Sequence, residues 1–171
     1  KEPFPETRVS IQPEAAAVLV KKGITIYVEQ GAGDKAFSND DDYTKAGAII
    51  RSRNEIIQAA DLILVIHPPT IEEAATLQGK ILVGIFQPLF NRELMKSWAR
   101  EGITSFSLDM LPRTTRAQSM DVLSSQANIA GYKAVLLAAE TYSRYIPMFM
   151  TAAGSIPPAK VLILGAGVAG L

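Results

Sequence analysis

The 171-residue sequence contains no cysteine and a single histidine, His67. The absence of cysteine excludes disulfides, thiolate catalysis and cysteine metal ligands, and fits a reducing compartment. A serine–histidine–aspartate triad would have to use His67, which ends an apolar run and precedes Pro68-Pro69. A lone histidine at such a position is more often structural than in contact with a substrate, so hydrolase chemistry is not indicated.

The sequence also lacks an excess of charge of either sign and any long apolar run. Lysine plus arginine and aspartate plus glutamate number 17 each, which leaves no basic surface for a nucleic-acid backbone. No apolar run approaches the ~20 residues that a membrane span needs. We expect a globular, soluble protein without nucleic acid. Because Lys1 is not a methionine and Leu171 falls in an expected helix, we interpret the sequence as a fragment.

Short apolar runs alternate with helical stretches up to about residue 108. This alternation predicts βαβ units and an α/β, Rossmann-like parallel sheet, in which ligands bind beyond the carboxyl ends of the strands. The expected strands are Ile24–Glu29, Asp61–Ile66, Lys80–Phe86 and Ile103–Leu108. The expected helices are Glu14–Lys22, Asp40–Ala46, Asn54–Ala60, Thr70–Leu77 and Asn91–Glu101, with Asn54 or Ser52 capping the third and Asn91 the last.

Three consecutive aspartates, Asp40 to Asp42, resemble a metal cluster at first sight. They open an expected helix, where negative charge is favoured by the helix dipole. We therefore assign no metal to them.

The remaining third of the chain has a different character. A long linking helix is expected over Asp121–Arg144, with small residues at helical spacing that predict a close backbone contact. Tyr145–Pro158 is interpreted as an apolar linker, and Lys160–Leu164 as a buried strand. We place a domain boundary between residues 125 and 126: 1–125 form the first domain and 126–171 the linking helix and the start of a second. The small residues at helical spacing in the expected linking helix are Ala127, Gly131, Ala134 and Ala138.

A glycine motif follows that last expected strand. Gly165, Gly167 and Gly170 form G-x-G-x-x-G, and Val168 can open a helix. In this context the glycines allow a tight turn and close approach of backbone amides to a pyrophosphate. The motif predicts dinucleotide binding but does not separate NAD from NADP.

The stretch between these two regions is polar. It carries Arg113, Arg116, Gln118, Asp121 and the pair Ser124-Ser125. If a helix begins near Ala117, then Gln118, Asp121 and Ser125 share a face. An arginine, an amide and a carboxylate suit a carboxamide and a ribose but form a poor acid–base set. The residues alone leave open that Asp121 is only a helix cap and that the arginines are only solvated charge.

Longer motifs resemble the alanine dehydrogenase and NAD(P) transhydrogenase family. The shared pattern includes ETRVSIQP, GAGDKAFSNDDDYTKAGA and VLILGAGVAGL. The runs RAQSMDVLSSQANIAGYKAV and PMFMTAAGSIPPAKVL are more similar to the transhydrogenase branch. The resemblance covers essentially the whole chain. It implies a Rossmann-like first domain, a linking helix and the start of a second Rossmann domain that binds NAD.

The resemblance also implies a site and a reaction. In the transhydrogenase branch a mobile loop binds the nicotinamide end of NAD(H), and its positions match Arg113, Gln118, Asp121 and Ser124. Arg113 would orient the dinucleotide and Gln118 would contact the ribose, while Asp121 and Ser124 would position the dihydronicotinamide. Hydride would pass directly to NADP⁺ on another subunit, without acid–base catalysis.

The expected partners follow from the same resemblance. They are a membrane-embedded proton-channel subunit and an NADP-binding subunit, so that hydride transfer is coupled to proton translocation. A homodimer is expected, cytoplasmic and peripheral on the inner membrane through its partners. The resemblance also implies a strand before Lys1 and the rest of the NAD domain after Leu171.

Two alternatives remain. Alanine dehydrogenases hold their substrate with an arginine, a lysine and a histidine, whose positions match Arg8, Ile66 and Gln87. The last two lack the required cation and acid–base group, which disfavours an amino-acid dehydrogenase. A non-catalytic regulatory module of the same fold is disfavoured because Arg113, Gln118 and Asp121 occur together.

Overall fold

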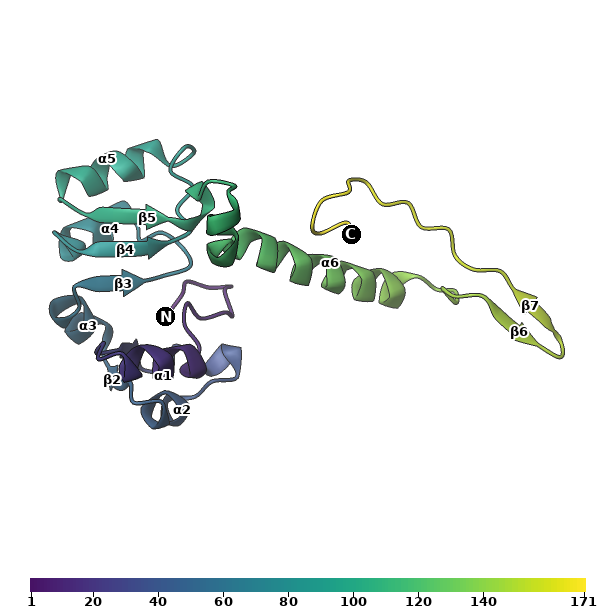
Figure 1. Ribbon diagram of the computed structural model, residues 1–171, viewed down its shortest axis with the longest axis horizontal. Helices are drawn as coiled ribbons and strands as arrows, with labels where there is room; N and C mark the ends of the chain where they lie inside the picture. Colours follow the sequence, from purple (N-terminus) through teal and green to yellow (C-terminus); the bar gives the residue numbers. More distant parts are fainter. The chain divides into compact units, whose positions relative to one another are not determined.

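The computed structural model describes residues 1–171, which form two compact units, Lys1–Pro112 and Arg113–Leu171 (Figure 1). Both units contain helices and strands. None of the helices combines the length and the apolar content that a membrane crossing requires.

All strands of the first unit pair in parallel, as the sequence predicts. β1 pairs with β2, and β3, β4 and β5 form a second sheet in that order. The α/β class with parallel, Rossmann-like sheets is therefore confirmed. Four strands lie within the predicted segments, whereas β2 was not predicted. The strands are β1 (Tyr27–Glu29), β2 (Ile49–Arg51), β3 (Leu62–Leu64), β4 (Ile81–Gly84) and β5 (Thr104–Ser107).

One helix precedes these strands and four connect them, all close to their predicted positions. Capping boxes begin α2, α3 and α4 at Asn39, Ser52 and Thr70, so Ser52 rather than Asn54 caps α3. Asn91 precedes α5 but makes no side-chain cap, and its amide Nδ2 donates to the Phe86 carbonyl at 2.8 Å. The helices are α1 (Pro13–Lys21), α2 (Asp40–Lys45), α3 (Arg53–Ala59), α4 (Ile71–Ala74) and α5 (Arg92–Arg100).

The consecutive aspartates have structural partners. Asp42 accepts a hydrogen bond from the Asn39 backbone at 3.0 Å, which completes the capping box of α2. Asp40 accepts one from the Gly31 backbone at 2.8 Å and so ties the preceding loop to the helix. Helix capping and loop closure account for these two carboxylates.

Two apolar clusters stabilise the first unit. One gathers around Leu82, Phe86 and Trp98, where the two rings meet edge to face with centroids 5.0 Å apart. The other surrounds Tyr43, whose buried hydroxyl donates to the Ile11 carbonyl at 2.7 Å. Each cluster includes a buried strand residue, Leu82 of β4 in the first and Val28 of β1 in the second.

The second unit is built on one long helix. α6 spans Val122–Thr141, so it begins one residue later and ends three residues earlier than predicted. A Cβ at Gly131 would lie 2.2 Å from the Ala169 carbonyl oxygen, so the expected close backbone contact is confirmed at this position. The expected linker instead contains a hairpin of β6 (Phe149–Thr151) and β7 (Gly154–Ile156). The sequence analysis did not predict this hairpin.

The predicted strand at Lys160–Leu164 is not hydrogen-bonded to another strand. Its apolar side chains are exposed, from 61% at Ile163 to 90% at Leu164. A strand is defined by its ladder partner, and an apolar run shows only a preference for that state. The prediction of a buried strand is therefore wrong for these residues.

Candidate functional site

The polar stretch after Pro112 is divided into a short helix, a break and α6. Residues Thr115–Met120 form a 3₁₀ helix, and Asp121 has non-helical backbone angles (φ −77°, ψ 85°). Because α6 starts only at Val122, Gln118 does not lie on it. The predicted shared face of Gln118, Asp121 and Ser125 is therefore wrong. The sequence pattern could not reveal the break, since short 3₁₀ turns have no distinctive spacing.

Asp121 caps α6 and is held by Ser124. Its Oδ1 accepts from the Ser124 backbone at 3.0 Å, and its Oδ2 accepts from the Ser124 hydroxyl at 2.6 Å. These bonds, the Ser124 hydroxyl first, lower the pKa of Asp121, and the charge of Arg113 contributes. The cap interpretation is confirmed. The carboxylate is therefore anionic at neutral pH, an acceptor only, and fixed in orientation.

The neighbouring polar residues are exposed. Arg113, Arg116 and Gln118 are exposed, whereas Ala117 between them is buried. The Asp121 amide donates to the Gln118 carbonyl at 3.3 Å, which joins the 3₁₀ helix to the cap. The structure therefore brings Arg113, Asp121 and Ser124 together, with Gln118 next to them through its backbone.

The glycines of the motif have separate roles. Gly165 has a φ of +106°, and a Cβ at Gly170 would meet the Gly165 carbonyl oxygen at 2.2 Å, so both shape the turn. A Cβ at Gly167 would meet nothing within 4 Å, so the space beside it is open to a ligand. The Gly167 carbonyl accepts from Gly170 at 2.9 Å and from Leu171 at 3.1 Å, the latter with helical spacing. Val168, next to Gly167, is half exposed.

One helix carries both halves of this site. Asp121 caps its first turn, and Gly131 receives the glycine turn through Ala169. Ten residues separate the two positions, which corresponds to ~15 Å along a helix axis. The Asp121 carboxylate offers hydrogen-bond acceptors at the start of α6, and the space beside Gly167 is free of protein atoms.

The first unit contains a second polar cluster, around Glu6. Arg8 donates to Glu6 through Nη2 at 2.6 Å and through Nε at 2.9 Å, and His67 Nε2 lies 2.9 Å from Glu6 Oε2. The Glu6 side chain is only 10% exposed. Arg8 holds the pKa of Glu6 well below its usual range, and Glu6 raises the pKa of Arg8. Glu6 was not among the predicted site residues, although it stands only two residues before Arg8.

The positions that would complete an amino-acid site lack suitable groups. Ile66 offers no side-chain cation, and its backbone amide donates to Glu2 at 2.7 Å. Gln87 is exposed in a left-handed conformation (φ 47°), and its backbone amide donates to Asp109 at 3.5 Å. Neither residue replaces the lysine or histidine of an alanine dehydrogenase, and Arg8 is already bonded to Glu6.

Two family models together match almost the whole chain. Residues 1–130 match the family model "Alanine dehydrogenase/PNT, N-terminal domain", and residues 134–171 match the corresponding C-terminal domain. The chain is 44% identical over 168 residues to the NAD(P) transhydrogenase subunit alpha of Cereibacter sphaeroides, covering 97% of this chain and 32% of that protein. An alanine dehydrogenase of Methanococcus maripaludis is 28% identical, covering 96% and 45%.

Solved structures give the same order of similarity. A transhydrogenase from Sinorhizobium meliloti matches with a TM-score of 0.93 and 44% identity, over 99% of this chain and 52% of that one. An L-alanine dehydrogenase matches with a TM-score of 0.78 and 27% identity, over 99% and 48%. The chain thus spans between about a third and about half of the length of these relatives. It belongs to the alanine dehydrogenase/PNT family.

Proposed function

We propose that the chain is a segment of the NAD(H)-binding alpha subunit of an NAD(P) transhydrogenase. One observation carries this proposal: the carboxylate of Asp121, fixed by Ser124 and near Arg113, caps the same helix that receives the glycine turn. The greater similarity to transhydrogenases than to alanine dehydrogenases supports it.

The loop residues would bind and orient the nicotinamide end. An anionic Asp121 can accept from the carboxamide amine, and its bonds to Ser124 keep both carboxylate oxygens in place. Arg113 would orient the dinucleotide, and Gln118 would contact the ribose. The dinucleotide itself supplies the hydride when it is bound. Because no side chain has to move a proton, catalysis would depend on proximity and orientation.

The glycine turn would hold the other end. Gly167 leaves space where a side chain would otherwise stand, and Gly165 and Gly170 keep the backbone tightly turned. We propose that Gly165, Gly167, Val168 and Gly170 approach the pyrophosphate. The backbone amides of the turn would then donate to phosphate oxygens.

The hydride acceptor and the pathway for protons would belong to other subunits. We propose that hydride passes from NADH to NADP⁺ on an NADP-binding subunit, coupled to proton translocation by a membrane-embedded subunit. The relatives' designation as a subunit alpha supports partners of this kind. On this proposal the protein is a cytoplasmic homodimer, peripheral on the inner membrane.

The alternative reaction is that of an amino-acid dehydrogenase. This reaction is disfavoured because Ile66 and Gln87 supply neither the cation nor the acid–base group that it needs. Arg8, which would hold the substrate, is bonded to Glu6. A non-catalytic module is disfavoured by the ordered Asp121–Ser124 pair beside Arg113.

The test uses the complete subunit mixed with the NADP-binding component of a transhydrogenase. Hydride transfer from NADH to an NADP⁺ analogue is followed, with pyruvate plus ammonia as the parallel substrates. We expect transfer between nucleotides and no alanine. Alanine formation would instead support the dehydrogenase alternative, and NAD binding without either activity would support a regulatory module.

A further inference from the structure

Side chains continue the pairing of β4 and β5 beyond the last backbone pair. The two strands are parallel and end at the same edge of their sheet, where the chain leaves β5 toward Arg113 (Figure 1). Gly84 and Ser107 form the last pair of the ladder. The Ser107 hydroxyl then accepts from the Phe86 amide at 2.9 Å, so a side chain takes the place of the next backbone acceptor.

Asp109 is the centre of this network. Its Oδ1 accepts from the Ser107 hydroxyl and from the backbone amides of Phe86 at 3.2 Å and Gln87 at 3.5 Å. Phe86 is fully buried, so its amide needs an acceptor within the protein. Gln87 has a left-handed backbone (φ 47°), a conformation that persists only where the surrounding structure holds it. Asp109 therefore ties the carboxyl end of β4 to the segment that follows β5.

The candidate loop Arg113–Asp121 begins four residues after Asp109, along a stiff connection. Asp109 lies in the 3₁₀ helix Leu108–Met110, whose first carbonyl accepts from the Leu111 amide at 3.4 Å. Leu111 is extended (φ −60°, ψ 132°), and Pro112, whose ring fixes its φ, follows directly. Because few torsions are free along this path, a displacement of Asp109 is transmitted to the start of the loop.

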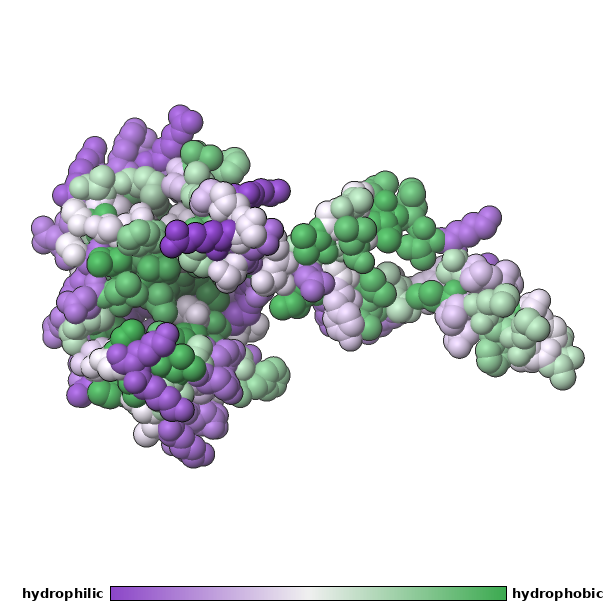
Figure 2. Space-filling view, in the orientation of Figure 1, coloured by the Kyte–Doolittle hydropathy of each residue, from purple (hydrophilic) through white to green (hydrophobic).

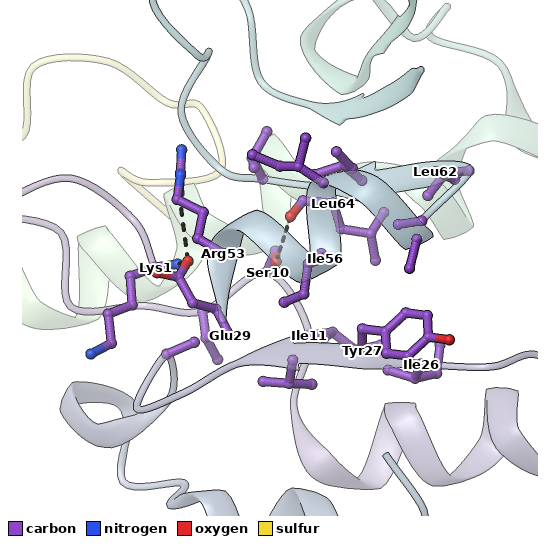
Figure 3. A pocket seen from close by; sticks show the side chains of 18 of the residues that line it. Lys1, Ser10, Ile11, Ile26, Tyr27, Glu29, Arg53, Ile56, Leu62 and Leu64 are labelled. Atoms are coloured by element: carbon purple, nitrogen blue, oxygen red, sulfur yellow. Dashed lines mark hydrogen bonds and ion pairs between the residues drawn. The ribbon is translucent and has the colours of Figure 1, made fainter. Parts of the chain in front are cut away.

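The carboxyl ends of β1 and β3 are held by other contacts. Apolar residues gather on the visible face between β3 and α1 (Figure 2), and both strands line a space of about 710 Å³. Beside it, Arg53 of α3 pairs with Glu29 at 3.5 Å, and the Ser10 hydroxyl donates to Leu64 at 3.1 Å (Figure 3). These contacts join the strands to α3 and to the segment before α1. The contacts of Asp109, by contrast, involve the segment that leads into the loop.

We propose that Asp109 is a positioning residue for hydride transfer, because it sets where the loop leaves the sheet and so where Arg113 begins. This inference rests on the proposed function, in which Arg113 orients the dinucleotide. Asp109 acts through the loop and touches no nucleotide, so its loss should disturb the alignment of a bound dinucleotide more than its binding. Misplacement of a reacting group by ~1 Å can cost ~100-fold in rate.

The first test is Asp109→Ala in the complete subunit, mixed with the NADP-binding component of a transhydrogenase. We expect kcat for hydride transfer to fall at least ~10-fold, while the Kd of NADH changes less than about twofold. Asp109→Asn keeps an oxygen that can accept the same hydrogen bonds, and it should recover kcat to within about threefold of the wild type. Unchanged kcat, a parallel loss of NADH affinity, or no recovery with asparagine would overturn the proposal.

Asn91→Ala is the matched control. The Asn91 Nδ2 donates to the Phe86 carbonyl at 2.8 Å, so this variant loosens the same turn after β4 without touching the segment that leads to the loop. We expect Asn91→Ala and Asp109→Ala to lower Tm by similar amounts, and Asn91→Ala to keep kcat within about twofold of the wild type. A fall in kcat as large as that of Asp109→Ala would show that the network only stabilises the fold, which would overturn the proposal.

Pro112→Gly tests the connection without disturbing the network, and it remains informative if Asp109→Ala does not fold. Glycine frees the backbone between Asp109 and the loop. We expect kcat to fall at least ~3-fold, with NADH affinity within about twofold of the wild type. Wild-type kcat in Pro112→Gly would contradict the stiff connection and overturn the proposal.

Trypsin cleavage after Arg113 and Arg116, quantified by mass spectrometry, gives a measurement that needs no activity. Both arginines are exposed, and the cleavage rate reports how often the loop opens. We expect cleavage at least ~5-fold faster in Asp109→Ala and Pro112→Gly than in the wild type and Asn91→Ala. If the wild type transferred no hydride, the proposed function would fail and this ratio alone would decide the positioning. Equal cleavage in all four proteins would overturn the positioning role.

Discussion

The Glu6 cluster and the Asp121 loop use similar groups in opposite ways. Glu6 is nearly buried and bonds to Arg8 and His67, so its charge is compensated within the first unit. Asp121 is held by Ser124, while Arg113, Arg116 and Gln118 remain exposed around it. The comparison teaches that polar residues bonded to one another stabilise the fold, whereas a fixed acceptor among exposed donors can still bind a ligand. Substitutions in the two regions test this division.

The largest effect is expected from Asp121→Asn in the complete subunit. Asparagine is an equally good helix cap but loses the negative charge that would accept from the carboxamide. We expect hydride transfer to fall about 100-fold, with stability and NAD affinity nearly unchanged, because misorientation costs rate more than binding. Stopped-flow transfer and NAD titration measure the two quantities. Gln118→Asn should act in the same direction.

Ser125→Ala provides the matched control. The Ser125 hydroxyl donates only to the Asp121 carbonyl, at 3.1 Å, and not to its carboxylate. Wild-type transfer in both Asp121→Asn and Gln118→Asn would remove the loop from the proposed site.

The Glu6 cluster should respond in stability instead. Glu6→Gln removes the charge that holds Arg8 and His67, which we expect to cost about 2 kcal/mol of unfolding free energy. Because the pKa of Glu6 is lowered in the folded state, its contribution is fully present above its ordinary value of 4.5 and is lost as the pH falls below it. Urea unfolding at pH 7 and pH 4 should show a difference between wild type and variant that shrinks on acidification.

A constant difference at both pH values would contradict the ion-pair explanation. The hydride-transfer rate of Glu6→Gln should equal that of the wild type at pH 7. A large loss of the hydride-transfer rate without a loss of stability would show that the Glu6 cluster acts in ligand binding and does not stabilise the fold.

Gly167→Val should weaken NAD binding by about tenfold, or about 1.4 kcal/mol, without lowering stability. The added side chain would enter space that is empty of protein atoms but is proposed to receive the pyrophosphate. Gly170→Ala is the contrasting variant, because its Cβ would clash with the Gly165 carbonyl and should disturb the turn itself. Isothermal titration and thermal unfolding separate the two effects. Unaltered affinity in Gly167→Val would make this glycine structural only.

The smallest effect is expected from the double variant Ile66→Lys, Gln87→His. It supplies the side chains of an alanine dehydrogenase, but Arg8 remains bonded to Glu6. We expect no alanine formation from pyruvate and ammonia, measured by NADH absorbance, and no change in nucleotide transfer. A gain of alanine formation would show that the cluster can open to a keto acid.

The sequence predicted the elements that depend on local residues. The strands β1, β3, β4 and β5, the parallel pairing and the close contact at Gly131 all follow from apolar runs or small residues. The strand β2 was missed, since its ladder depends on β1, 22 residues earlier in the chain, and the local β6–β7 hairpin was missed as well. The same dependence explains the unpaired Lys160–Leu164.

The sequence indicated which residues make up the candidate site better than it indicated how they are arranged. The motif and the cap indicated Gly167 and Asp121, and the resemblance added Arg113, Gln118 and Ser124. The break at Asp121, which separates Gln118 from α6, results from a backbone turn that no side-chain pattern records. The roles of these residues toward a nucleotide stay predictions. The bonding of Glu6 to His67 was not predictable, because 61 residues separate them.

The contact of Gly131 with the glycine turn has a consequence for affinity and release. A dinucleotide anchored at the turn would have its far end tethered near the first turn of the same helix. Tethering of this kind gives effective concentrations of order millimolar. The residues around Asp121 would therefore need only weak intrinsic affinity for the nicotinamide. Such a loop can align its ligand once per turnover and still release it quickly.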